Sequence, residues 1–472
     1  MKNNLILKII LIGSFLAGTA SLAKPNLIFI MADDLGYGDL GCYGQKLIKT
    51  PRLDQMAQEG MKFTRFYAGC TVCAPSRSVL MTGQHMGHTH VRGNAGGDMN
   101  RQSLRDQDFT VAEAFKMAKY STALIGKWGL GEVAQEGHPL KQGFDYFYGY
   151  LNQVHAHNFY PEFLWRNREK HILANIVQPV SKNSRAGFIG GAATKRVDYS
   201  HDLFAEEALE WIRKNKNNPF FLYLPLTIPH ANNEGSRLFG DGAEVPDYGI
   251  YEKKDWPKQD KGQAAMITRM DKDVGQILDL LESLNIAKNT LVIFTSDNGP
   301  HNEAKHNPER FTPAGPLRGM KRTLTEGGIR MPTIAWQPDT VAKGSQCDQP
   351  FYFGDLMATA CEMVGTAIPK NTDSISFLPT LKGQPTKQSS HKYLYWEFYE
   401  RIFRQAVVKN EWKLIRSGMD NSQVELYDLN KDIHEDKNLA RTHPALVQRL
   451  ISHMEEAHVP HPNWKASQSQ KK

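Results

Sequence analysis

The run Asn26-Leu27-Ile28-Phe29-Ile30-Met31-Ala32 is mostly apolar and β-prone, and it ends in the acidic pair Asp33-Asp34. Three later runs have the same form, an apolar stretch followed by residues able to do chemistry: 122–126 before Lys127, 219–224 before His230, and 290–296 before Asp297-Asn298. Amphipathic segments such as 109–119 and 201–214 separate these runs. Near-continuous apolar strands that alternate with amphipathic helices indicate an α/β fold, with a mostly parallel sheet sandwiched by helices.

The polar residues after these strands are expected to meet in one place. In a parallel α/β sheet the functional site forms at the carboxyl ends of the strands. Asp33, Asp34 and Asp297 would bring three carboxylates there, and Asn298 an amide. This is the oxygen-rich ligand set of a hard divalent cation such as Ca²⁺ or Mg²⁺. A single pair of this kind is usually a turn or a helix cap, whereas two pairs together predict a metal site.

The stretch 70–83, Cys-Thr-Val-Cys-Ala-Pro-Ser-Arg-Ser-Val-Leu-Met-Thr-Gly, predicts a helix with a reactive residue at its start. Pro75 suits the first helical turn, and Gly83 can end the helix. Cys73 then lies where unpaired backbone N–H groups attract anions, and Arg77 follows one turn later on the same face. The stretch therefore predicts an anion-binding site that contains a nucleophile.

These motifs, in this order, resemble a known family. Cys-x-Pro-Ser-Arg with a following Thr-Gly is similar to the signature of the type I, formylglycine-dependent sulfatases, which are arylsulfatase-like and belong to the alkaline-phosphatase-like superfamily. The resemblance continues along the chain, in Met-Ala-Asp-Asp at 31–34, Gly-Lys-Trp at 126–128, Pro-His at 229–230, Ser-Asp-Asn-Gly at 296–299 and two motifs at 317–321 and 325–330. It covers nearly all of the chain after the first residues.

The resemblance implies an enzyme that hydrolyses sulfate esters. Cys73 would be oxidised to formylglycine by a formylglycine-generating enzyme during maturation. One hydroxyl of the hydrated aldehyde would attack sulfur and expel the sugar or aryl oxygen, and the second would drive the elimination of inorganic sulfate. The family's metal, expected to be Ca²⁺ with Mg²⁺ as the alternative, would be held by Asp33, Asp34, Cys73, Asp297 and Asn298.

Other catalytic roles follow from the same resemblance. Arg77, Lys127 and Lys321 would offset the charge on the transferring group, which is electrostatic stabilisation by preorganised groups. His230 is the first choice for protonating the leaving oxygen, and Lys321 is the second. Outside this context His230 would more often be a structural histidine, and Lys321 a solvated surface lysine.

The chain departs from the family pattern at Gly129, where the family has a histidine after Gly-Lys-Trp. Another histidine has to enter the pocket, or the release of sulfate proceeds differently. The candidates are His88 and His90 in one segment and His155 and His157 in another, and the second pair is favoured. Four residues are predicted to contact the substrate: Arg92, Asn94, His155 and His157.

The sequence also predicts how the chain is divided. Residues 1–23 have two lysines, an apolar run and small residues before Lys24, which is typical of a secretory signal peptide, with a retained anchor as the alternative. Residues 24–385 form the predicted catalytic domain and 386–464 a C-terminal subdomain. That subdomain has strand-like runs at 393–398, 405–409, 412–416 and 424–429 and a helix at 444–457, which indicates an antiparallel sheet with a packed helix. Residues 465–472 form a polar tail expected to be disordered.

The composition of the chain limits the classes of molecule that it is expected to bind. The chain has 472 residues, 40% of them hydrophobic, and a formal charge of +7 that includes Lys2 and Lys8 of the leader. This mild basic excess suits an acidic substrate such as a sulfated carbohydrate or an aryl sulfate. Nucleic acid is not expected, because no arginine-rich run with interleaved aromatics occurs. No stable membrane span is expected either. The predicted leader indicates export to the periplasm or the extracellular space.

Cysteine pairing and the reaction each leave alternatives open. With Cys73 converted, Cys42, Cys70, Cys347 and Cys361 remain, either as thiols or in one of three pairings. A phosphatase or phosphodiesterase of the related fold is one rival function, although Cys73 argues against it. A sulfated-glycan-binding relative without catalysis is the other, supported by Gly129 alone.

Overall fold

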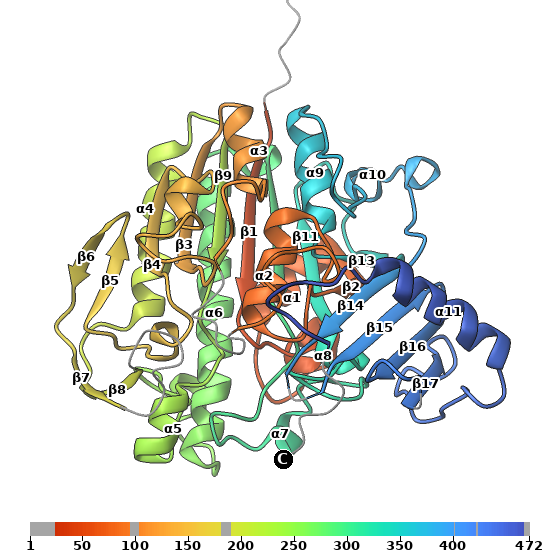
Figure 1. The fold of residues 1–472 in the computed structure, drawn as a ribbon. Helices are drawn as coiled ribbons and strands as arrows, with labels where there is room; N and C mark the ends of the chain where they lie inside the picture. Colours follow the sequence, from red (N-terminus) through yellow and green to blue (C-terminus); the bar gives the residue numbers. More distant parts are fainter. Residues whose placement is uncertain (1–23, 95–102, 181–189, 401, 422, 467–472) are drawn as a thin grey trace, which may run out of the picture.

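A computed structural model describes residues 24–94, 103–180, 190–400, 402–421 and 423–466. The predicted leader and residues 467–472 of the predicted tail lie outside these ranges. An eleven-stranded sheet has the order β12-β2-β11-β10-β1-β9-β3-β4-β5-β6, with β13 paired to β2 (Figure 1). Its strands are β1 (Asn26–Ala32), β2 (Met61–Tyr67), β3 (Ser121–Lys127), β4 (Tyr146–Tyr150), β5 (Phe163–Arg166), β6 (Glu169–Ile172), β9 (Phe220–Pro225), β10 (Thr290–Ser296), β11 (Arg330–Trp336), β12 (Ser345–Cys347) and β13 (Phe351–Tyr352).

The centre of this sheet is parallel. The strand β1 pairs in parallel with both β10 and β9, and β3 pairs in parallel with β9 and β4. Antiparallel pairs occur toward the two sides, between β10, β11 and β2 and between β4, β5 and β6. The mostly parallel sheet predicted from the four apolar runs is confirmed, and each of those runs is a central strand.

Helices cover both faces of the sheet. Along β1, Leu27, Phe29 and Met31 enter one hydrophobic core, while Ile28 and Ile30 enter the other, because successive side chains of a strand point to opposite faces. The first core lies under α2 (Cys73–Thr82), α3 (Val111–Met117) and α9 (Asp355–Val364). The second lies under α1 (Pro51–Glu59), α4 (Ser200–Asn215) and α6 (Lys258–Ser283). Burial on both faces explains why these strands lack a polar alternation.

A smaller antiparallel sheet follows in the chain, as predicted. Its order is β14-β15-β16-β17, and α11 packs on one face (Figure 1). Val407, Leu414 and Leu426 from three strands meet Leu450 and Met454 of the helix in a small hydrophobic core. The elements of this unit are β14 (Leu394–Phe398), β15 (Arg404–Lys409), β16 (Trp412–Ser417), β17 (Gln423–Asp428) and α11 (Pro444–Ala457).

The small sheet is joined to the large one by buried polar contacts. Trp396 Nε1 donates to the carbonyl oxygen of Ala68 at 2.8 Å, and Lys413 Nζ lies 2.8 Å from a carboxylate oxygen of Glu326. The Lys413–Glu326 pair is fully buried, and each partner has a second charged contact, Glu435 for Lys413 and Arg330 for Glu326. This compensation matters because an unpaired buried ion is costly. The C-terminal strands are therefore held firmly against the segment before α2.

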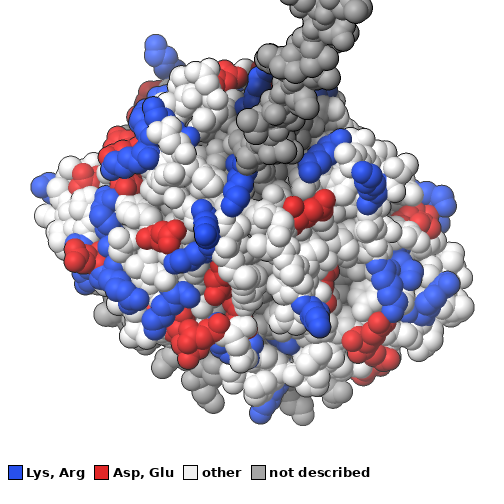
Figure 2. All heavy atoms as spheres, turned by 90° about the horizontal axis from the view of Figure 1, so that it is seen from above, with Lys and Arg blue, Asp and Glu red and all other residues white. Residues whose placement is uncertain are grey.

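The remaining described elements connect these units or lie at their edges. They are β7 (Ile176–Pro179), which pairs with β8 (Gly191–Lys195), and the short helices α5 (Asn233–Phe239), α7 (Pro308–Phe311), α8 (Glu326–Ile329) and α10 (Leu378–Leu381). Figure 2 shows the face at the amino ends of the central strands, where basic and acidic side chains are interspersed. The buried charged groups described next lie at the opposite, carboxyl ends.

Candidate active site

The floor of the site is formed where β1 and β10 end. Ala32 pairs with Ser296 in the parallel register, so Asp33 and Asp297 follow side by side. The backbone N–H of Asp34 donates to Asp297 Oδ1 at 3.1 Å, and Asn298 Nδ2 donates to Asp34 Oδ1 at 2.6 Å. All four side chains are buried. The two polar pairs singled out in the sequence therefore form one oxygen-rich cluster.

Each carboxylate of this cluster contacts a cation from another element. Lys127 Nζ, at the end of β3, lies 2.6 Å from Asp33 Oδ2. An Arg77 guanidinium nitrogen, from α2, lies 2.7 Å from Asp297 Oδ2, and Lys321 Nζ lies 2.7 Å from Asp34 Oδ2. Buried charges of one sign require such compensation, because desolvation of an unpaired ion is costly.

Cys73 is the first residue of α2, as predicted, and Gly83 ends that helix with a left-handed φ of 70°. The Cys73 Sγ lies 3.4 Å from Asp33 Oδ1. Next to it, Asn94 Oδ1 accepts a hydrogen bond from the Ala74 N–H at 2.8 Å. Burial, together with the charge of Asp33, raises the pKa of the Cys73 thiol well above its usual range. An unmodified Cys73 is therefore a neutral thiol, which is a poor nucleophile.

His230 and Lys321 form a hydrogen-bonded pair beside the cluster. The distance from His230 Nδ1 to the Ala231 carbonyl oxygen is 2.7 Å, so Nδ1 carries the proton, and Nε2 accepts from Lys321 Nζ at 3.0 Å. Burial and the Lys321 charge lower the pKa of His230 to about 3. Burial also disfavours the Lys321 cation, but Asp34 and Glu303 outweigh it and raise the pKa of Lys321. The proton of this pair therefore resides on Lys321.

The oxygen cluster suits a divalent cation. Burial and the nearby charge of Asp33 raise the pKa of Asp297 to about 7, which is a repulsion that a bound cation would relieve. Asn298 Oδ1 is buried and has no hydrogen-bond partner among the described residues. Carboxylate and amide oxygens of this kind are the ligands of Ca²⁺ and Mg²⁺. The residues present can therefore bind a metal ion.

A pocket of about 230 Å³ opens above this floor. Six residues expected from the sequence line it: Cys73, Asn94, Lys127, His157, His230 and Lys321. Sequence reasoning missed the others at its rim, above all Gln153, Asn233, Glu303, Arg322 and Glu400. Arg322 bridges two of these, since its side chain contacts Glu303 and its Nε lies 3.0 Å from Glu400. Gln153 and Arg322 stand next to motifs that were recognised, so proximity to those motifs was the only available signal.

Arg92 and His155 lie elsewhere than expected. The Arg92 guanidinium donates to the carbonyl oxygens of Thr89 and Gly87 and contacts Glu397 of β14, so it joins the small sheet to the segment after α2. His155 packs on Tyr150 and lines a separate pocket. Neither residue lines the pocket above Cys73.

Of the four histidines considered in place of the family residue at 129, His157 lines the pocket. Its ring stacks on that of His230 with centroids 5.0 Å apart, and its Nδ1 lies 3.0 Å from a Glu234 carboxylate oxygen. His88 instead contacts Asp373 at 2.9 Å, and His90 Nδ1 lies 3.1 Å from a ring nitrogen of His461. Convergence in space thus selects His157 from the pair that the sequence favoured.

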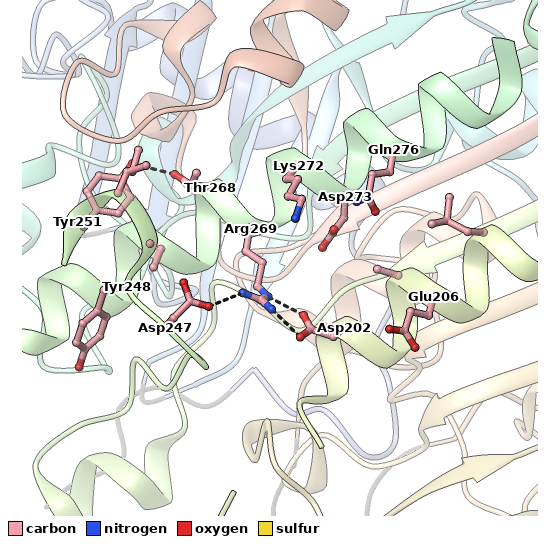
Figure 3. Close-up of a pocket in the computed structure, with 15 residues that line it drawn as sticks. Asp202, Glu206, Asp247, Tyr248, Tyr251, Thr268, Arg269, Lys272, Asp273 and Gln276 are labelled. Atoms are coloured by element: carbon pink, nitrogen blue, oxygen red, sulfur yellow. Dashed lines mark hydrogen bonds and ion pairs between the residues drawn. The ribbon is translucent and has the colours of Figure 1, made fainter. Parts of the chain in front are cut away.

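A larger pocket, of about 500 Å³, lies between α4 and α6. Figure 3 shows Arg269 at its centre, between Asp202 at 2.6 Å and Asp247 at 3.2 Å. Arg269 is already paired with these two carboxylates, and the groups described above for the oxygen-rich cluster are not among the lining residues of this pocket. We therefore assign the active site to the smaller pocket.

Two observations concern the whole described structure. All five cysteines are free, which favours thiols over the three disulfide pairings. Within the described ranges, no helix combines the length and the apolar character needed to cross a membrane.

Comparisons with known proteins agree with this geometry. The family model described as "Sulfatase" matches residues 25–366, and the model described as "N-sulphoglucosamine sulphohydrolase, C-terminal" matches 320–459. N-acetylgalactosamine-6-sulfatase of Canis lupus familiaris is 31% identical over 394 residues, which are 80% of this chain and 70% of that protein. N-acetylgalactosamine-6-O-sulfatase of Bacteroides thetaiotaomicron is 28% identical, and the alignment covers 92% of this chain and 93% of that protein.

Solved structures share the fold. A Bacteroides thetaiotaomicron 6S-sulfatase, connected with the metabolism of multiple glycosaminoglycans, superposes with a TM-score of 0.74 at 27% identity, over 92% of this chain and 99% of that one. Ps i-CgsB in complex with k-i-k-neocarrahexaose superposes with a TM-score of 0.76 at 24% identity, over 94% and 95% of the two chains. Since the family model covers most of the chain, this protein belongs to the sulfatase family and is a sulfuric ester hydrolase.

Proposed function

We propose that this protein is an exported sulfatase that hydrolyses a sulfate ester on a carbohydrate and releases inorganic sulfate. One observation carries the proposal: Cys73 and the cations of Arg77, Lys127 and Lys321 surround a single oxygen cluster at the base of one pocket. The names of the relatives, which act on sulfated N-acetylgalactosamine, favour a carbohydrate over a simple aryl sulfate.

Residue 73 is proposed to act as formylglycine, whose hydrated aldehyde supplies one hydroxyl to attack sulfur and a second to release sulfate. Asp33, Asp34, Asp297 and Asn298, with residue 73 itself, would hold Ca²⁺ or Mg²⁺, which polarises the sulfate group. The high pKa of the thiol supports conversion, since unmodified Cys73 would be uncharged and weakly nucleophilic.

The chain's own cations would bind and orient the sulfate group. Lys127 and Lys321 line the pocket, and Arg77 lies beneath it with its guanidinium fixed by Asp297 and by the Lys127 carbonyl oxygen at 2.6 Å. Fixed charges of this kind stabilise negative charge as it develops on the transferring group without reorganising. Protonation of the leaving oxygen falls to the His230–Lys321 pair, in which Lys321 holds the proton.

His157 is proposed as the histidine that assists sulfate release in place of the family residue at 129. Its Nδ1 faces the Glu234 carboxylate, which fixes the orientation of the ring. Asn94 is proposed to contact the substrate at the start of α2, because it lines the pocket and holds the Ala74 N–H.

Export and the division of the chain are part of the proposal. Residues 1–23 would be removed, residues 24–385 would form the catalytic domain, and 386–464 would form the C-terminal subdomain. The separate hydrophobic core under α11 supports the last division. A mature N-terminus at Lys24 in protein recovered from the periplasm or medium would verify the export proposal, whereas an intact leader there would contradict it.

The decisive experiment is the mass of the tryptic peptide 66–77 from protein made in a host that generates formylglycine. This peptide contains Cys70 as well as Cys73, so Cys70 is an internal control. After thiol alkylation we expect one alkylated cysteine, at 70, and an aldehyde at 73. Two alkylated cysteines in such a host, together with no turnover of sulfate esters, would overturn the mechanism.

A parallel assay separates the rival functions. The purified protein is offered N-acetylgalactosamine-6-sulfate, 4-nitrophenyl sulfate and 4-nitrophenyl phosphate. Release of sulfate without comparable release of phosphate is expected. Preferential phosphate release would favour a phosphatase of the related fold, and saturable binding of the sulfated sugar without turnover would favour a binding protein.

A further inference from the structure

Gly129 leaves a space that another side chain fills. It follows Lys127 and Trp128 at the end of β3, with a φ of 80°, in the left-handed region that favours glycine. A Cβ built at position 129 would lie 2.0 Å from Gln153 Nε2 and 2.8 Å from Gln153 Cδ. A side chain at 129 and the observed position of Gln153 are therefore mutually exclusive.

Gln153 is held in this position by the turn that follows β4. The backbone N–H groups of Trp128 and Gly129 donate to the carbonyl oxygens of Tyr150 and Leu151, at 2.9 and 3.1 Å. Asn152 Oδ1 accepts from the Val154 N–H at 2.8 Å and closes the turn. The segment carrying Gln153 is thus hydrogen-bonded directly to the segment from which the family histidine is missing.

Gln153 lines the pocket and carries a buried amide nitrogen that is unpaired within the described part of the chain. The residue is 7% exposed, and its Nε2 has no hydrogen-bond partner among the described residues. It lines the pocket together with Cys73 and Lys127. A buried donor left unpaired is unfavourable, so a ligand with acceptor oxygens would gain by binding there.

We propose that Gln153 is a sulfate-binding residue, whose Nε2 donates a hydrogen bond to an oxygen of the substrate's sulfate group. The inference rests on the proposed function and deepens it. The carboxamide donates without changing charge, so Gln153 contributes to holding the sulfate and not to proton transfer. The role of the missing histidine is thereby divided, with proton transfer left to His157 in the 3-10 helix (His155–His157) that follows the turn.

The test compares Gln153→Ala and Gln153→Glu with the parent enzyme. Gln153→Ala removes the donor, and Gln153→Glu puts a carboxylate of the same shape beside the sulfate. Gln448→Glu, on the exposed side of α11, adds the same charge outside the pocket and serves as the control. We measure kcat/KM for the sulfate ester and, separately, the binding of inorganic sulfate by calorimetry.

We expect each Gln153 variant to weaken the binding of inorganic sulfate and to lower kcat/KM, by at least about tenfold for Gln153→Glu. The control should stay within about twofold of the parent. Sulfate binding and turnover that remain at the parent level in both variants would overturn the inference. If the parent fails to turn over any sulfate ester, the proposed function fails, and the calorimetric comparison still decides the role of Gln153.

Discussion

The floor and the rim of the pocket are built differently. The floor comes from the ends of central strands and from α2, and its charged side chains are buried in mutual contact. The rim comes from loops and from the segment after β14, and Arg322 and Glu400 keep 38% and 35% of their side chains exposed. The floor is thus rigid and suited to one chemistry, whereas the rim can adapt to the sugar that carries the sulfate.

Replacement of the residue at the centre of the floor should have the largest effect. Cys73→Ala removes the proposed source of the nucleophile and is expected to lower sulfate-ester turnover at least about a thousandfold. Cys70→Ala, at the buried cysteine three residues earlier, is the control and should retain turnover with a lower melting temperature. Equal activity in the two variants would mean that the floor has no special nucleophile.

Removal of the metal ion should rank second. Loss of a Lewis acid worth several kcal/mol is expected to lower kcat at least about a hundredfold on treatment with a chelator. The melting temperature should fall as well, because Asp33, Asp34 and Asp297 then repel one another without a bound dication. Restoration by Ca²⁺ compared with Mg²⁺ identifies the ion, and an unchanged rate after verified metal removal contradicts the proposed ligand set.

Replacement of Lys321 should affect substrates with a poor leaving group more than substrates with a good one. Lys321→Met removes the group that holds the proton of the His230–Lys321 pair, and general acid catalysis contributes about 10²- to 10⁴-fold. That loss should appear with a sugar sulfate, whose alkoxide leaves poorly, and be much smaller with 4-nitrophenyl sulfate. A similar loss with both substrates would assign Lys321 to sulfate binding alone.

Changes at the rim should be milder and depend on the substrate. Glu400→Gln removes a carboxylate that holds Arg322, and loss of hydrogen bonds worth about 1 kcal/mol each predicts a KM for the sugar sulfate raised about fivefold. The rate with 4-nitrophenyl sulfate should not change, because that substrate has no sugar hydroxyls. An equal effect on both substrates would show that Glu400 supports the floor.

The smallest effect concerns a buried carboxylate outside the site. Asp39 accepts a hydrogen bond from the Gly36 N–H and has no salt-bridge partner among the described residues, and burial raises its pKa to about 8. Since the folded state then binds a proton more tightly than the unfolded chain, stability should fall as pH rises from about 4 to about 8. Asp39→Asn should abolish this fall and melt a few degrees higher at pH 8, with unchanged activity. If the melting temperatures of the parent and of Asp39→Asn changed with pH in the same way between about pH 4 and about pH 8, the predicted effect of Asp39 would be contradicted.

The sequence was most informative about the floor. Each strand that positions a catalytic group is mostly apolar, and Asp33, Lys127 and Asp297 lie at or directly after the ends of those strands, so their convergence could be predicted from parallel-sheet geometry. The elements of the C-terminal unit could be predicted equally well, because the alternation of apolar and polar residues in strands and the helix start at Pro444 are local signals.

The rim could not be predicted in the same way. Glu303 and Glu400 are almost a hundred residues apart, and neither belongs to a motif with a fixed place in the fold. Arg92 and Asn94 are separated by a single residue, yet Arg92 turns toward Glu397 and Asn94 toward α2. The direction of the backbone in a loop decides which of two nearby side chains enters a pocket. A periodic pattern in the sequence does not encode that direction.

The burial of Cys73 has a consequence for the order of events in the life of the protein. Its side chain is 2% exposed, and the preceding segment is covered by β14, where Trp396 binds the Ala68 carbonyl oxygen and the Cys70 thiol approaches the Glu397 carbonyl oxygen. An enzyme that matures Cys73 would therefore have to reach it before β14 and the strands after it fold into place. Slow folding of the C-terminal strands would lengthen the time available for maturation, and premature closure would trap an inactive, fully folded protein.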